Sequence, residues 1–327
     1  MQAMQARGWG GLDQLALAEL PDPVPGPGEV LIEVAAAGLN FADSLLIAGK
    51  YQVRPQPPFV PGFEVAGTVC AVGAGVARLR AGERVLAILD GGGYAELALA
   101  LEKDVFRIPD AMSFAAAAGF GIAYGTAHGA FAWRGDLKPG EVALVLGAAG
   151  GVGLTAVEVA KAMGATVIAA AGGPEKLAIA KAHGADHLID YKADTLRQRV
   201  KEICDGRGAD VVFDPVGGEL FDQAMRTANW NARLVVVGFA GGTVPQIPAN
   251  ILLVKNLAAV GLYWGSYREK EPARVAESFR QLFRWYEEGK LKPLVSNRYR
   301  LAEAPQALTL LTERRATGKV VLTTGPG

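Results

Sequence analysis

The segment 142–160 combines the pattern of a buried strand, a glycine-rich turn and a helix in direct succession. An apolar run flanked by turn residues is typical of a central parallel strand, whose two faces are both covered. The following helix would begin at the glycines, where its unpaired N–H groups face a bound phosphate. Ala148, Gly150 and Gly153 hold the glycine positions of GxGxxG. The segment predicts a dinucleotide-binding turn, with a plain strand-to-helix turn as the alternative. The expected pyrophosphate contacts are Ala149, Gly150, Gly151 and Val152.

The next predicted strand, 165–170, indicates which dinucleotide is bound. An acidic residue normally ends this strand and binds the ribose 2′-hydroxyl. Here Gly172 and Gly173 follow the strand, and Lys176 lies in the first turn of the next helix. A 2′-phosphate would fit, because no carboxylate repels it and an ammonium group is within reach. We therefore expect NADPH rather than NADH, while a solvated helix position is the alternative role of Lys176.

The chain beyond residue 140 alternates regularly between strand and helix patterns, which predicts a doubly wound parallel sheet with its ligand at the carboxyl edge. The expected strands are 142–146, 166–170, 187–190, 210–214, 234–237 and 257–262, and the expected helices are 151–163, 174–183, 194–204, 219–227 and 275–286. Val216 and Gly238 lie in two loops on that edge, 214–218 and 238–242, where backbone can approach a flat ring. Ordinary turn chemistry explains each loop equally well.

The first third of the chain has a different rhythm. Short β-like runs at 30–34, 67–72, 84–88 and 96–99 are separated by Gly- and Pro-rich turns, which is typical of a small barrel. A helix follows from Ser113, which is a suitable N-cap. Since 327 residues exceed what one core usually holds, we expect two domains.

Composition excludes several classes of protein. Lysine plus arginine equals aspartate plus glutamate at 33 each, so no basic surplus favours nucleic acid or an anionic membrane. We find no signal peptide or membrane span in the pattern and expect a cytoplasmic protein. The two cysteines and three histidines form neither a disulfide framework nor a ligand set, so no metal is expected.

The chain resembles the zinc-independent quinone oxidoreductases, or zeta-crystallin type, of the medium-chain dehydrogenase/reductase superfamily. The matching segments are 38–43 (GLNFAD), 61–67 (PGFEVAG), 92–96 (GGYAE), 147–153, 214–218 and 316–321 (ATGKVV). The resemblance implies a Rossmann NADPH-binding domain at 119–262, inserted into a GroES-like catalytic domain made of 1–118 and 263–327. It also implies a homodimer joined through the sheet edge at 257–262.

The same resemblance implies a reaction without zinc. Alcohol dehydrogenases of the superfamily hold a catalytic zinc through a cysteine and a histidine, and those positions look to be Asn40 and Phe63 here. Without a metal, the acceptor must be one that hydride delivery alone can reduce. We expect an NADPH:quinone reductase. A reductase of 2-alkenals, enones or enoyl thioesters is the alternative, and a non-catalytic NADPH-binding or RNA-associated protein is a third.

Individual roles also follow from the resemblance. It places Asn40, Asp43 and Tyr51 around the nicotinamide and substrate, although Asp43 alone reads as a helix-start residue and Tyr51 as a packed aromatic. The implied cofactor contacts are Thr126 at the carboxamide, Lys176 and Tyr191 at the 2′-phosphate and adenine, Phe239 at the nicotinamide, and Arg315, with Arg314 as its rival. Some relatives carry a serine or threonine where Gly172 and Gly173 offer only backbone N–H groups.

Overall fold

The computed structural model describes residues 1–325 and divides into two compact units. Residues 1–122 and the chain from 293 onward form the first unit, and residues 123–292 form the second. The expected boundaries, after 118 and 262, differ from this division chiefly at 263–292. That segment packs within the second unit, because Ser278 Oγ hydrogen-bonds His128 Nδ1 at 2.8 Å and the Trp285 ring meets the His128 ring edge-on.

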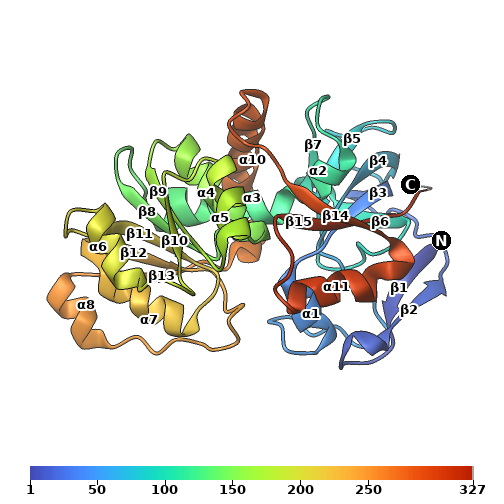
Figure 1. Cartoon of the computed structure of the whole chain (residues 1–327). Helices are drawn as coiled ribbons and strands as arrows, with labels where there is room; N and C mark the ends of the chain where they lie inside the picture. Colours follow the sequence, from blue (N-terminus) through green and yellow to red (C-terminus); the bar gives the residue numbers. More distant parts are fainter. Residues whose placement is uncertain (326–327) are drawn as a thin grey trace. The chain divides into compact units, whose positions relative to one another are not determined.

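The second unit contains a six-stranded parallel sheet in the order β10-β9-β8-β11-β12-β13 (Figure 1). Its strands are β8 (Val142–Leu146), β9 (Thr166–Ala171), β10 (His187–Asp190), β11 (Ala209–Asp214), β12 (Ala228–Val236) and β13 (Ala258–Gly261). β8 and β11 pair in the middle, where four of the five residues of β8 are buried. This is the doubly wound sheet that the alternating pattern predicts, and that part of the fold class is confirmed.

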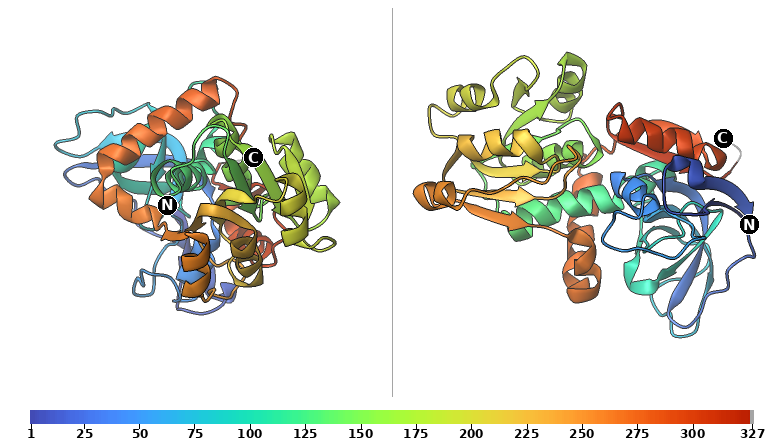
Figure 2. Two further views of the ribbon diagram at one scale, coloured as in Figure 1. Left: turned by 90° about the vertical axis from the view of Figure 1, so that its left-hand side faces the viewer. Right: turned by 90° about the horizontal axis from the view of Figure 1, so that it is seen from below.

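Helices cover both faces of this sheet (Figure 2). The α- and π-helices of this unit are α3 (Gly121–His128, beginning at the end of the first unit), the π-helical Gly129–Arg134, α4 (Gly151–Ala162), α5 (Pro174–Ala182), α6 (Leu196–Ile203), α7 (Gly218–Thr227), α8 (Ala249–Lys255), α9 (Tyr267–Lys270) and α10 (Pro272–Glu287). Leu144 and Leu146 join one core with Phe221 and Met225 of α7. Because side chains alternate along a strand, the buried Val145 points to the opposite face.

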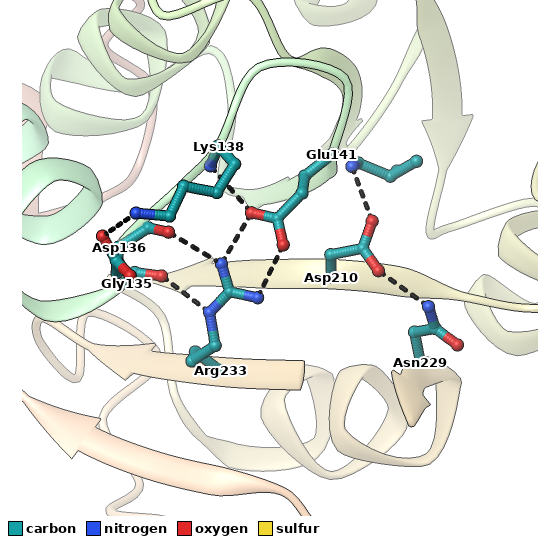
Figure 3. A network of polar contacts seen from close by, with 8 residues as sticks. Gly135, Asp136, Lys138, Glu141, Asp210, Asn229 and Arg233 are labelled. Atoms are coloured by element: carbon teal, nitrogen blue, oxygen red, sulfur yellow. Dashed lines mark hydrogen bonds and ion pairs between the residues drawn. The ribbon is translucent and has the colours of Figure 1, made fainter. Parts of the chain in front are cut away.

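A polar network closes the amino edge of the sheet (Figure 3). Arg233 on β12 makes two bonds to the Glu141 carboxylate, at 2.8 and 2.6 Å, and donates to the carbonyl of Gly135 at 2.7 Å. Asp210 accepts from the N–H of Val142 at 2.9 Å. The network therefore joins the segments before β8 and β11 to β12, at the end opposite the glycine turn.

The first unit contains a seven-stranded sheet whose main path is β14-β15-β3-β4-β5-β7, with β6 paired to β3, and a separate β1-β2 pair. The strands are β1 (Gln2–Ala6), β2 (Leu15–Glu19), β3 (Glu29–Gly38), β4 (Glu64–Val72), β5 (Arg84–Ile88), β6 (Leu97–Leu101), β7 (Val105–Arg107), β14 (Val295–Arg300) and β15 (Lys319–Thr323). The helices are α1 (Phe41–Ile47), α2 (Phe114–Ala118) and α11 (Ala304–Thr312). Ser113 caps α2 as expected, accepting from Ala116 N–H at 3.2 Å.

The expected barrel is corrected in one respect. Among the described residues, no strand pairing joins β14 to β7. The domain is therefore β-rich, but its sheet is not closed into a barrel by hydrogen bonds. A second correction concerns strand length, because β3 extends over ten residues where the apolar pattern marks only 30–34. Ala36 to Gly38 continue the strand because they pair with β4 and β15, after an irregular position at Ala35. Within the described chain, no helix is both long and apolar enough to span a bilayer.

Candidate active site

The glycine turn lies between β8 and α4. Gly147 directly follows β8 and has φ of +62°, a conformation that favours glycine. The N–H of the next residue, Ala148, donates to the carbonyl of Ala170 on β9 at 3.1 Å. Gly150 is the N-cap of α4 and offers no side chain to its first N–H groups. These groups therefore remain available to an anion at the helix start.

Close backbone packing fixes the shape of this turn. A Cβ on Gly153 would lie 2.1 Å from the Gly147 carbonyl oxygen, so only glycine lets the first turn of α4 approach the end of β8. A Cβ on Gly150 would meet only that same oxygen, at 3.5 Å, and is otherwise open. The turn is thus closed toward the protein and open at the helix start, which is the shape that a pyrophosphate requires.

The end of β9 is lined by the segment after β10. Gly173 has φ of +97° and donates to Asp190 Oδ1 at 3.1 Å, and Lys192 N–H donates to the same oxygen at 3.0 Å. A Cβ on Gly172 would lie 2.9 Å from Lys192 Cε and 3.2 Å from the Tyr191 hydroxyl. Tyr191 therefore lies beside Gly172, and its role at the cofactor stays a prediction. The exposed Lys192 brings a cation that we did not predict from the sequence.

The two edge loops form one structure. Asp214 is fully buried, and its carboxylate accepts N–H bonds from Val216 and Gly217 at 2.8 and 2.9 Å. Burial raises the pKa of Asp214 to about 6, against the opposing effect of these N–H groups. Gly241 N–H in turn donates to the Val216 carbonyl at 2.7 Å. Val216 also faces the glycine turn, since a Cβ on Gly147 would lie 3.1 Å from its Cγ2.

The remaining expected cofactor residues are placed as follows. Thr126 is buried on α3, Phe239 is 39% exposed in the second loop, and Lys176 is half-buried in the first turn of α5. Arg315 is exposed after α11 and pairs with Glu313 at 3.0 Å. Arg314, its rival, has φ of +58°. The structure thus brings the turn, Val216, Gly172 and Tyr191 to the carboxyl edge of one sheet, while Arg315 belongs to the first unit.

Asn40 is the centre of a buried network in the first unit. Its Oδ1 accepts from Lys319 Nζ at 2.7 Å, and its Nδ2 donates to Glu64 Oε1 at 2.9 Å. Lys319 and Glu64 also form an ion pair at 2.9 Å, with side chains only 7% and 1% exposed. A buried ammonium group of the chain itself therefore contacts Asn40, the residue that the resemblance places where related alcohol dehydrogenases have a zinc ligand. No group of three or more His, Cys, Asp or Glu in the described chain is arranged to hold a metal.

Asp43 adjoins this network through the backbone. Its Oδ2 accepts from Asn40 N–H at 2.7 Å and from the Tyr94 hydroxyl at 2.9 Å, while its Oδ1 is buried with no hydrogen-bond partner among the described residues. Burial raises the pKa of Asp43 to about 7, although both hydrogen bonds and Lys319 lower it. The helix-start reading of Asp43 is therefore also fulfilled, since it caps the first turn of α1.

Tyr51 lies on the loop after α1 and packs on Phe63, with ring centroids 5.4 Å apart. Phe63 is 8% exposed and directly precedes Glu64. The aromatic pair therefore lies next to the Asn40 network, because Phe63 and Glu64 are consecutive residues.

Sequence reasoning missed Glu64, Lys319, Tyr94 and Asp214, although all four lie in segments that it singled out. The available signal was a charge at the start or end of an apolar strand: Glu64 precedes Val65 and Ala66, and Lys319 precedes Val320 and Val321. A charge in such a position is almost never fully buried unless it is paired. The partner, however, stands 255 residues away and leaves no mark in the local pattern.

Two family models match this chain. The model described as zinc-binding dehydrogenase matches residues 151–286, and the model described as alcohol dehydrogenase GroES-like domain matches residues 26–110. Their order along the chain is that of a GroES-like segment followed by a dehydrogenase segment. The zinc in the first description has no counterpart in Asn40 and Phe63.

Relatives that match nearly the whole chain show to which family it belongs. The chain is 43% identical over 302 residues to the quinone oxidoreductase-like protein 2 homolog of Nematostella vectensis, covering 91% of this chain and 82% of the relative. It is 35% identical to the quinone oxidoreductase of Pseudomonas aeruginosa, with 98% of each covered. The structure of Escherichia coli quinone oxidoreductase complexed with NADPH matches with a TM-score of 0.93 and 30% identity over 99% of this chain and 100% of that one. The chain belongs to the zeta-crystallin-type quinone oxidoreductase family of the medium-chain dehydrogenase/reductase superfamily.

Proposed function

We propose that this oxidoreductase uses NADPH to reduce quinones without a metal ion. The observation that carries the proposal is the Asn40 carboxamide, which is bonded to a buried ammonium group at the place where a metal would otherwise polarise the substrate. A neutral N–H donor suits an acceptor that is already activated, such as a quinone, better than an alcohol, which must lose a proton before it can give up hydride.

NADPH fits the residues of the second unit. The pyrophosphate would lie at the start of α4, against Gly150, Gly151 and Val152, because a Cβ is excluded at Gly153 and the helix start carries no side-chain cap. The 2′-phosphate would lie beside Gly172 and Gly173, with Lys176, Tyr191 and Lys192 as its partners. The Escherichia coli protein, whose structure holds NADPH, supports this choice of cofactor. When bound, NADPH supplies the hydride.

The residues of the first unit would act on the acceptor. Asn40 Nδ2–H would donate to the acceptor carbonyl oxygen, which gains negative charge as hydride adds to the conjugated system. The Tyr51 and Phe63 rings would line the acceptor. One quinone takes up a hydride and one proton to become a hydroquinone, and we assign the proton to solvent. Asp43 would hold the Asn40 backbone in place through the bond at 2.7 Å.

The test is the rate of NADPH oxidation with ortho- and para-quinones and with a crotonyl thioester. We expect kcat/KM to be higher with at least one quinone than with the crotonyl thioester. If the protein binds NADPH measurably but turns over no quinone, quinones are not its substrates. Turnover of the thioester alone would replace the proposed activity with that of a reductase of enones or enoyl thioesters.

We also propose a homodimer formed through β13, because this strand ends the sheet order and two of its four residues are exposed in the single chain. A lysine in an edge strand opposes pairing with another strand. We expect light scattering to give the mass of two chains for the wild type and of one chain for Ala258→Lys. A dimer that survives this substitution would rule out the edge. The expected cytoplasmic location stays a prediction.

A further inference from the structure

The Lys319 ammonium group is completely committed within the first unit. Its three hydrogens have three acceptors: Leu39 O at 2.7 Å, Asn40 Oδ1 at 2.7 Å and Glu64 Oε1 at 2.9 Å. The second oxygen of Glu64 accepts from Ile122 N–H at 2.9 Å. A group with every donor used in this way has one orientation, because any rotation breaks a charge-assisted bond in a buried place.

Glycines make room for this buried pair. A Cβ on Gly38 would lie 2.0 Å from the Ala118 carbonyl oxygen and 2.7 Å from Glu64 Oε1. A Cβ on Gly119 would lie 2.9 Å from Lys319 Cβ. The backbone is thus shaped around two charges whose burial is not in itself a strong source of stability, since well-packed apolar side chains often do as well. The pair calls for an explanation beyond stability.

The pair determines which way the Asn40 carboxamide faces. Lysine can only donate, and a carboxylate can only accept, so Oδ1 must face Lys319 and Nδ2 must face Glu64. The flipped amide would place NH2 against the ammonium group and oxygen against the carboxylate, losing two charge-assisted bonds at once. A carboxamide with uncharged neighbours has no such constraint.

One hydrogen of Asn40 is left over. Nδ2 carries two hydrogens, and Glu64 Oε1 takes one of them at 2.9 Å. Among the described residues, no acceptor bonds to the second. Asn40 is 7% exposed, so the group is nearly but not fully enclosed. The remaining hydrogen is the one that an acceptor carbonyl would meet.

We propose that Lys319 and Glu64 are positioning residues, whose ion pair fixes the Asn40 carboxamide so that the second Nδ2 hydrogen faces the acceptor carbonyl. This inference rests on the proposed function, in which Asn40 binds that carbonyl. Lys319 and Glu64 touch neither substrate nor cofactor in this account, and they act only through Asn40.

A double-mutant cycle tests this dependence. The pair variant Lys319→Met/Glu64→Gln removes both charges together, so that no unpaired charge is left buried. We expect it to lower kcat/KM for the quinone by about 10- to 100-fold, mainly through kcat, because the donor is misplaced rather than lost. In the Asn40→Ala background the same two substitutions should change kcat/KM by no more than about twofold. An equal loss in both backgrounds would overturn the proposal.

A matched control removes another ion pair. Lys161 and Asp186 form a contact at 2.8 Å in the second unit, away from the glycine turn. Lys161→Met/Asp186→Asn should leave kcat/KM within about threefold of the wild type, whatever its effect on stability. A loss as large as that of the first pair variant would show that any ion pair has this effect, and would contradict a positioning role.

A second measurement needs no substrate. The Asn40 side-chain signals in nitrogen–proton correlation spectra can be assigned by their absence in Asn40→Ala. We expect their exchange with water to be at least about tenfold faster in the pair variant, since a charge-assisted bond is lost. Unchanged exchange would overturn the fixed orientation. If the wild type reduces no quinone but this arm succeeds, the proposed function fails while the orientation of Asn40 stands.

Discussion

The proposed cofactor site of the second unit and the Asn40 network of the first unit are built from different parts of the polypeptide. In the second unit the proposed phosphate site is made of backbone: N–H groups at the start of α4 and glycines that let the chain pack closely. In the first unit the site around Asn40 is made of side chains, joined by bonds between residues 24, 255 and 279 positions apart. The backbone site is local in sequence, and the side-chain site is not.

This difference decides how each site responds to change. A backbone site tolerates substitution of almost any side chain but not an added Cβ where chains approach closely. A side-chain site tolerates added bulk at its rim but not the loss of one charged partner, because the other then stays buried and unpaired. The following predictions test this contrast.

The largest effect on NADPH binding is expected at Gly153. Its Cβ in Gly153→Ala would lie 2.1 Å from the Gly147 carbonyl oxygen, so the start of α4 must move away from β8. We expect NADPH affinity to fall by about 100-fold or more, because a displacement of this size misplaces the phosphate donors. Gly265→Ala is the matched control, since its Cβ would meet nothing closer than 3.7 Å. Normal NADPH binding by Gly153→Ala in a titration would break the comparison.

The largest effect on stability concerns Asp43 and its dependence on pH. Burial raises its pKa from 3.8 to about 7 in the folded protein, so the folded state holds this proton more tightly than the unfolded chain. The stability that the proton contributes is therefore present below pH 3.8 and is lost as the pH rises to about 7. The difference corresponds to about 4 kcal/mol.

Asp43→Asn should remove this dependence. Denaturant unfolding at a series of pH values should show the wild type losing stability relative to Asp43→Asn across that range, and then no further loss above it. The exposed Asp222→Asn serves as the control. Parallel curves for wild type and Asp43→Asn would mean that Asp43 ionises in the fold as it does in the unfolded chain.

The smallest effect is expected at Lys192, whose Cε would lie 2.9 Å from a Cβ on Gly172. Lys192→Met should weaken NADPH binding by about tenfold and leave NADH binding unchanged, because only NADPH carries the 2′-phosphate. Lys181→Met, in which the lost ammonium group bonds instead to the Asp186 carbonyl at 3.3 Å, is the control. Equal changes for both cofactors would remove Lys192 from the phosphate site.

The same contrast explains what the sequence could predict. The strand, turn and helix at 142–160 follow from local patterns, and β8, the glycine turn and α4 lie where those patterns indicate. The doubly wound sheet follows because alternating strands and helices leave few other topologies. The limits of the expected helices and strands differ by only one or two residues in this region, with two exceptions. The helix α10 begins three residues early, at Pro272, and β12 begins at Ala228 because it also pairs with β11 there.

Lys319 and Glu64 could not be predicted in this way. Each stands at the start of an apolar strand, and nothing local to either names the other. Their pairing depends on β15 lying beside β3 and β3 beside β4, a sheet order that no local pattern encodes. The local patterns also do not show whether the first and last strands of the sheet pair, so we expected a barrel where the sheet is open. The resemblance to a family supplied Asn40 as a candidate, but only the structure supplies the groups that hold it.

We propose above all that the Asn40 carboxamide, rather than a metal ion, assists hydride transfer. This proposal is tested most directly by the rate of NADPH-dependent quinone reduction after exhaustive dialysis against a metal chelator. We predict a rate within about twofold of the untreated enzyme, because the Asn40 carboxamide is held by its bonds to Lys319 and Glu64. A rate abolished by the chelator and restored by zinc would contradict the account.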